Sequence, residues 1–187
     1  MHFYNLLTTV ASFALAASAL PQPQGLSIGT TITTSAASTT TSSTTSSGGV
    51  QIVNNMNETV YLWSTSNGGS EMQTLEAGGN GYWESFETNS DGSGISIKMA
   101  TTASEASVLQ FEYTKDSSIV FWDLSCIDLD VDSLFVASGF SVTTSDSTCS
   151  TASCAAGDSD CSDAYQEAND EDTYSCSSSA TFTLTLG

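Results

Sequence analysis

Carboxylates are the side chains of this sequence that could act chemically in pairs. The candidates are Asp123, Asp128, Glu112 and Asp163. Hydrolysis of a glycosidic bond needs two acids about 5–10 Å apart and an environment that raises the pKa of at least one. The chain has 21 acids, so two will lie close together by chance. We therefore expect no enzymatic activity and keep hydrolysis as an alternative.

Mechanisms that depend on imidazole are not expected. The one histidine is His2, which should leave with the leader peptide, so Ser125 and the other serines have no histidine to activate them. No Gly-Lys-Ser loop that would cradle phosphate is present. We expect no cofactor.

A calcium loop is suggested by Asp128, Asp130 and Asp132 but is incomplete. The sixth position, which should be glycine, is Ser133, and the twelfth, which should be glutamate, is Gly139. Three acids at every second position are more typical of a solvated strand face. We expect no metal site.

Five cysteines fall between Cys126 and Cys176. Clustered cysteines in a small chain with a leader indicate disulfides formed in an oxidising compartment. A zinc site is disfavoured because no histidine is near and the C-x2-C pairs of zinc sites are missing. The odd number leaves at least one thiol unpaired within a monomer.

Aromatic side chains are candidates for stacking on sugar rings. Tyr82 and Trp83 are neighbours in a strand-like segment, so one of them should face outwards, and we predict a binding surface there. Trp122 is expected in the core. Asn57 begins the one N-glycosylation sequon, Asn57-Glu58-Thr59.

Three segments of different composition make up the chain. Residues 1–19 contain a short apolar run and small residues before a cleavage site after Ala19, which predicts a signal peptide. Residues 20–49 are rich in Ser and Thr, which predicts a disordered stalk, with O-linked sugar as the favoured reading and a bare linker as the alternative. Residues 50–187 hold the aromatic and aliphatic residues of one folded domain.

Short apolar segments with period-two alternation recur through that domain, separated by turns. No helical periodicity is sustained, which predicts an all-β sandwich. We expect residues 50–53 and 60–63 to form a hairpin with Asn57 at its tip. We expect a strand at residues 119–122, followed by an alternating segment at 127–132 and an apolar return strand from residue 134. Further strands are expected at residues 82–86, 95–99, 108–113 and 180–186.

The formal net charge of −19 limits the partners. Such a field repels nucleic acid and anionic membrane surfaces, and it favours cations, basic proteins or neutral, hydroxyl-rich ligands. We expect no nucleic-acid partner and, after signal cleavage, no membrane partner.

The order of several short motifs resembles the thaumatin-like proteins, and more closely their small fungal secreted branch, the yeast-phase-specific or antigenic thaumatin-like proteins. The motifs are Val50–Val53, Val60–Trp63, Leu75 with Gly78-Gly79, Asp123–Ser125, Ile127-Asp128, Cys161–Tyr165, Thr173–Cys176 and Phe182–Leu184. The resemblance implies a thaumatin-like β-sandwich that lacks most of the cysteine-rich second domain of the plant proteins. It also implies the disulfides Cys149–Cys176 and Cys154–Cys161, with Cys126 as a free thiol.

The plant relatives carry an acidic cleft built from one Arg, one Glu and three Asp. Asp123 and Asp128 match two of these aspartates, whereas Gln110 stands where the glutamate would fall and the chain has no arginine. We therefore predict a secreted, non-catalytic glycoprotein, extracellular or associated with the cell wall. It would be a monomer that binds cell-wall polysaccharide such as β-glucan, or a host protein, through Tyr82, Trp83, Asp123 and Asp128. The alternatives are a weak β-1,3-glucan hydrolase that uses Asp123 and Asp128, and a structural coat protein.

Overall fold

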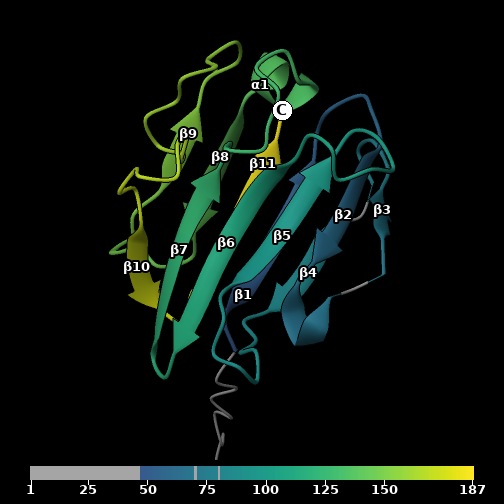
Figure 1. The fold of residues 1–187 in the computed structure, drawn as a ribbon. Coiled ribbons are helices and arrows are strands. Elements are labelled where there is room, and N and C mark those ends of the chain that lie inside the picture. Colours follow the sequence, from purple (N-terminus) through teal and green to yellow (C-terminus); the bar gives the residue numbers. More distant parts are fainter. Residues whose placement is uncertain (1–46, 70, 80) are drawn as a thin grey trace, which may run out of the picture. The chain divides into compact units, whose positions relative to one another are not determined.

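Two β-sheets packed face to face form the domain. A computed structural model describes residues 47–187 except residues 70 and 80. The five-stranded sheet has the order β4 (Tyr82–Ser85), β1 (Gly49–Asn54), β11 (Thr181–Leu186), β8 (Phe140–Thr144), β9 (Ala152–Cys154). The six-stranded sheet, in front in Figure 1, has the order β10 (Tyr174–Ser177), β7 (Ile119–Ser125), β6 (Leu109–Asp116), β5 (Ile95–Ala100), β2 (Val60–Ser64), β3 (Gln73–Leu75). The expected β-sandwich is confirmed. The expected signal peptide and residues 20–46 of the expected stalk lie outside the described residues.

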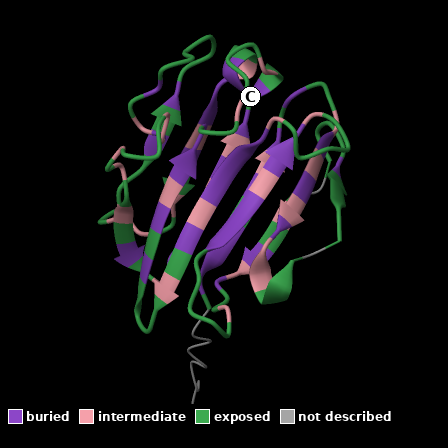
Figure 2. Ribbon diagram, in the orientation of Figure 1, coloured by how far each residue is buried: buried purple, intermediate pink, exposed green. Residues whose placement is uncertain are grey.

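The core lies between the sheets, and buried residues alternate with more exposed ones along strands such as β2 and β7 (Figure 2). Trp122 is fully buried, as expected, and its ring lies 5.8 Å from Phe111 and 5.2 Å from Phe182. Aromatic side chains of this size each bury roughly 150–250 Å², so this cluster is a large part of what joins the two sheets.

The expected hairpin of residues 50–53 and 60–63 is wrong. Both segments are strands, but β1 pairs with β11 and β4, whereas β2 pairs with β3 and β5 in the other sheet. Alternation predicts which face of a strand is buried, not which strand lies beside it. The crossover is held by the buried Asn54, whose Nδ2 donates to the carbonyl oxygens of Glu58 at 2.8 Å and Leu75 at 3.0 Å.

The expected strands at residues 127–132 and from residue 134 are also wrong. Residues 127–132 form turns, and Val131 is 72% exposed. The apolar run that follows is the short helix α1 (Leu134–Ser138), because the Ser133 side chain caps it by accepting from the Val136 N–H at 3.3 Å. The other helical element of the described residues is the 3-10 turn η1 (Ser66–Gly68). Within the described part of the chain, neither helix has the length and apolarity needed to cross a membrane.

Candidate functional site

A pocket of about 370 Å³ opens on the outer face of the six-stranded sheet. Its floor carries Glu112 of β6 and Asp123 of β7, which stand directly opposite each other in the strand pairing. Both occupy the positions that alternate with the buried core residues, so both side chains project away from the core. Ser96, Thr114, Phe121 and Thr173 complete much of the lining.

The two carboxylates perturb each other. Burial raises the pKa of Asp123 to about 7, and the neighbouring Glu112 charge adds to the rise. Burial also raises the pKa of Glu112; Ser96 and Lys98 oppose that rise, and Asp128 adds to it. The pair therefore tends to hold a proton near neutral pH, as expected for like charges on a partly desolvated surface.

Asp123 also has an unused acceptor. Its Oδ1 is buried and has no hydrogen-bond partner among the described residues. Phe121, two residues earlier on the same face of β7, is 42% exposed. Asp123 lines the pocket, so a ligand hydroxyl could hydrogen-bond to its carboxyl group. The pocket thus combines a carboxyl group with an accessible aromatic side chain.

Gln110 fills a structural position beside this pocket. The Ser96 Oγ donates to its Oε1 at 3.0 Å, and its Nε2 donates to the Ser125 Oγ at 3.4 Å. All three side chains are buried. This neutral network joins β5, β6 and β7 at the place where the family resemblance would put a glutamate.

A second and larger hollow of about 620 Å³ adjoins the pocket, and Gly94 lines both. Its walls are the η1 turn and the loop before β5. The loop is ordered by Asn89, whose Oδ1 accepts from the Asn67 N–H at 2.9 Å and whose Nδ2 donates to the Ser93 Oγ at 3.1 Å. Gly94 lies where the two hollows meet, and we call the pair of hollows the groove; a ligand longer than one ring could contact both.

The residues predicted from the sequence to bind a ligand do not lie together. Asp123 lies in the pocket. Asp128 is exposed in the turn after β7, outside the pocket lining, although its charge acts on Glu112. Trp83 is 48% exposed on the outer face of the five-stranded sheet, whereas the Tyr82 hydroxyl donates to the buried Glu84 at 2.7 Å.

Phe121 was missed by the sequence analysis, although a signal for it exists. Ile119, Phe121 and Asp123 alternate with the core residues Val120 and Trp122. Once Trp122 is placed in the core, period two puts Phe121 and Asp123 on the same outer face.

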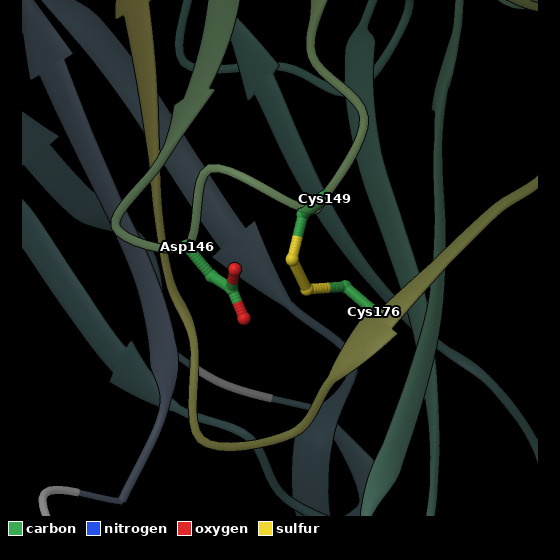
Figure 3. A group of neighbouring side chains, drawn as sticks. All are labelled: Asp146, Cys149 and Cys176. Carbon is green, nitrogen blue, oxygen red and sulfur yellow. A yellow bond between two sulfur atoms is a disulfide. The ribbon is translucent and has the colours of Figure 1, made fainter.

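Both disulfides implied by the family resemblance are present, Cys149–Cys176 and Cys154–Cys161. Asp146 lies beside the first (Figure 3), and the three side chains have the spacing of a metal site. While the sulfurs are bonded to each other they offer no thiolate, so this group is not a metal centre. Cys126 is free and buried.

Two further candidates lie away from the pocket. Asn57 is exposed in the turns that connect β1 to β2, and its glycosylation stays a prediction. Asp163 accepts from the Ser153 N–H at 2.9 Å and so caps the edge of β9.

Comparison with known proteins gives a consistent set of relatives. Residues 37–187 match the family described as Blastomyces yeast-phase-specific protein. The chain is 46% identical to the secreted thaumatin-like protein calA of Emericella nidulans over 187 residues, covering 98% of this chain and 97% of the relative. It is 34% identical to an antigenic thaumatin-like protein of Arthroderma benhamiae over 136 residues, covering 72% of this chain and 68% of the relative. Among solved structures, the crystal structure of the protein elicitor MoHrip2 from Magnaporthe oryzae has the same fold, with a TM-score of 0.61 and 22% identity over 74% of this chain and 98% of that one.

Proposed function

Because the chain belongs to the Blastomyces yeast-phase-specific family of secreted thaumatin-like proteins, we propose that it binds a neutral polysaccharide without cleaving it. The protein is secreted, so cell-wall polymers such as β-glucan are accessible to it. The observation that carries the proposal is the Asp123 carboxyl in the pocket lining, with the exposed Phe121 on the same face of β7.

Each part of the pocket matches a feature of a sugar ring. A ring hydroxyl donates to the Asp123 carboxyl group, and the apolar face of the ring packs against Phe121. The hydroxyls of Thr114 and Thr173, both exposed, add further donors and acceptors. The net charge of −19 disfavours polyanions, so the polymer is uncharged.

The orientation of the acids favours binding over hydrolysis. In a glycosidase the scissile bond lies between two carboxyl groups. Glu112 and Asp123 instead project side by side from neighbouring strands of one sheet face. A hydrolase remains the second candidate, because a carboxyl with a pKa of about 7 beside another acid is the pattern of an acid–base pair. Its partner acid would be Glu112 rather than Asp128.

The test measures binding and cleavage on the same samples. The secreted protein is incubated with soluble β-1,3-glucan oligosaccharides, and both binding and released reducing sugar are quantified. Phe121→Ala and Asp123→Asn should each weaken binding about tenfold, the effect of losing about 1.4 kcal/mol. Ile119→Ala is the matched control, because it removes an exposed apolar side chain from the same face of β7 outside the pocket.

The outcomes separate the functions. Wild-type binding by both pocket variants would overturn the proposal. Sugar release that Asp123→Asn abolishes would establish the hydrolase, and Asp128→Asn should leave that release in place. Neither binding nor release by the wild-type protein would favour the structural coat role.

The length of the groove adds a quantitative expectation. Soluble β-1,3-glucan oligosaccharides should bind more tightly as they grow long enough to reach from Asp123 past Gly94 to the hollow beside Asn89. Gly94→Val narrows the passage, since a Cβ there lies 3.0 Å from the Thr114 Oγ1. This variant should remove the gain in affinity with length, as titration calorimetry would measure.

A further inference from the structure

The outward strand positions of the five-stranded sheet are uncharged and rich in hydroxyl groups. One row crosses four strands as Trp83, Gln51, Thr183 and Thr143, paired in register. Thr181 and Thr185 flank Thr183 on the same side of β11. We call these six residues the threonine face. None of the outward positions of β4, β1, β11, β8 and β9 holds an acid or a base.

The absence of charge on these strands contrasts with the rest of the domain. The chain has 21 acids, and the outward positions of the six-stranded sheet include Lys98, Glu112, Asp116 and Asp123. The threonine face and the Asp123 pocket lie on opposite sides of the sandwich, because each is on the outer face of its own sheet. A ligand on one face therefore does not contact the other.

Trp83 is held in place on this face although it is 48% exposed. Its ring lies over β1 at Gly49, where a Cβ would come within 2.7 Å of the indole Cζ2. Glycine at this position leaves room for the ring against the strand. An exposed aromatic ring that is already positioned loses little conformational entropy on binding.

We propose that the threonine face docks onto the surface of an insoluble, uncharged polysaccharide. Side chains repeat about every 4.8 Å across the strands and about 6.7 Å along them, which gives a regular array of hydroxyls for a regular array of sugar hydroxyls. Trp83 stacks on a ring at the edge of the array. A second copy of the chain is a poor occupant because two charges of −19 repel. An apolar partner is also a poor fit, since threonine hydroxyls dominate the face.

The test compares the same polymer in solid and soluble form. The probes are insoluble β-1,3-glucan particles and short soluble β-1,3-glucan oligosaccharides, with full-length secreted protein. Thr183→Glu and Trp83→Ala should each weaken binding to particles at least tenfold and leave oligosaccharide binding unchanged. Thr183→Val keeps the β-branched shape and removes one hydroxyl, so it should weaken particle binding by only about fivefold.

Two controls keep the result interpretable. Thr74→Glu places the same charge on an exposed strand position of the other sheet, outside the groove, and should bind particles like the wild type. Raising NaCl to about 0.5 M, where charges are screened within a few ångströms, should leave wild-type particle binding unchanged.

The inference stands independently of the pocket. Wild-type particle binding by Thr183→Glu and Trp83→Ala would overturn it, as would a steep loss of wild-type binding with salt. If the threonine-face proposal fails but Phe121→Ala weakens oligosaccharide binding in the same experiment, the pocket proposal still stands. If instead only the threonine-face variants have an effect, the pocket proposal fails and this one is supported.

Discussion

Asp123 is the residue on which the chemistry of the pocket depends, and its ionisation also affects stability. Burial and Glu112 raise its pKa to about 7, above the roughly 3.9 expected in the unfolded chain. Between these two pKa values the folded state therefore binds the Asp123 proton more tightly than the unfolded state does. Stability from this group is complete below about pH 4 and is lost as the pH rises through 7.

The corresponding prediction compares Asp123→Asn with the wild type. From pH 4.5 to pH 8 the wild type should lose about 1–2 kcal/mol more unfolding free energy than the variant, a figure reduced for the partial exposure of the carboxyl. Urea unfolding at both pH values measures this. Asp116→Asn, which removes an exposed acid of β6 from the same sheet face, should retain the wild-type slope. Equal slopes for wild type and Asp123→Asn would contradict the prediction.

Cys126 illustrates how burial controls reactivity. Its thiol is buried, and desolvation raises its pKa to about 11, with Gln166 opposing the rise. Because the thiolate is the reactive form, native protein at pH 8 should react with a thiol reagent far more slowly than a free cysteine peptide. Denaturant should expose one reactive thiol per chain. Fast labelling of the native protein would show that Cys126 is accessible.

The strands were more predictable than their arrangement. Alternation located β5, β6 and β11, and the β-branched and aromatic run from residue 119 located β7. It did not predict that β1 would pair in parallel with the distant β11, since partner choice depends on packing across the whole sandwich. In residues 127–138 the same apolar pattern occurs in turns and a helix, which the Ser133 cap initiates. The Asp123 site residue was found by resemblance, whereas Phe121 required knowing which face of β7 is buried.

The Cys149–Cys176 disulfide connects elements of different sheets. Cys149 lies in the loop after β8 of the five-stranded sheet, and Cys176 lies in β10 at an edge of the six-stranded sheet. With a sequence separation of 27 residues, it should contribute about 3–4 kcal/mol by loop entropy. The Cys154–Cys161 bond spans 7 residues and should contribute about 2–3 kcal/mol.

Paired serine substitutions test whether the Cys149–Cys176 disulfide stabilises the fold more than the Cys154–Cys161 disulfide does. Cys149→Ser with Cys176→Ser should lower the unfolding free energy by more than Cys154→Ser with Cys161→Ser, as denaturant titration measures. The second pair is the matched control, because it also removes one disulfide. A larger loss from the short bridge would mean that local packing at β9, rather than loop length, sets the stabilisation.

At the scale of the whole molecule, charge and shape divide the sandwich into two surfaces. The six-stranded sheet carries acids and a groove suited to a single polysaccharide chain. The five-stranded sheet carries an uncharged face suited to a solid surface. A protein with both could attach to a wall through one face while the other holds a loose chain. This arrangement follows from period-two alternation, which lets each sheet bury one face and vary the other.

The net charge of −19 should make the folded state sensitive to salt. Lys98–Glu105, at 3.2 Å, is the one salt bridge among the described residues, so most acids repel one another without compensation. Raising NaCl from about 10 mM to about 1 M shortens the Debye length from about 30 Å to about 3 Å. The melting temperature at pH 7 should therefore rise by several degrees in calorimetry, about 1–2 kcal/mol.

The control for this salt effect is pH. At about pH 3.5 most carboxylates are protonated, so the same salt step should raise the melting temperature much less. An equal rise at both pH values would show that salt acts through preferential exclusion from the protein surface instead of through charge screening. The comparison thus tests whether repulsion among the acids, concentrated away from the threonine face, is what limits the stability of this sandwich.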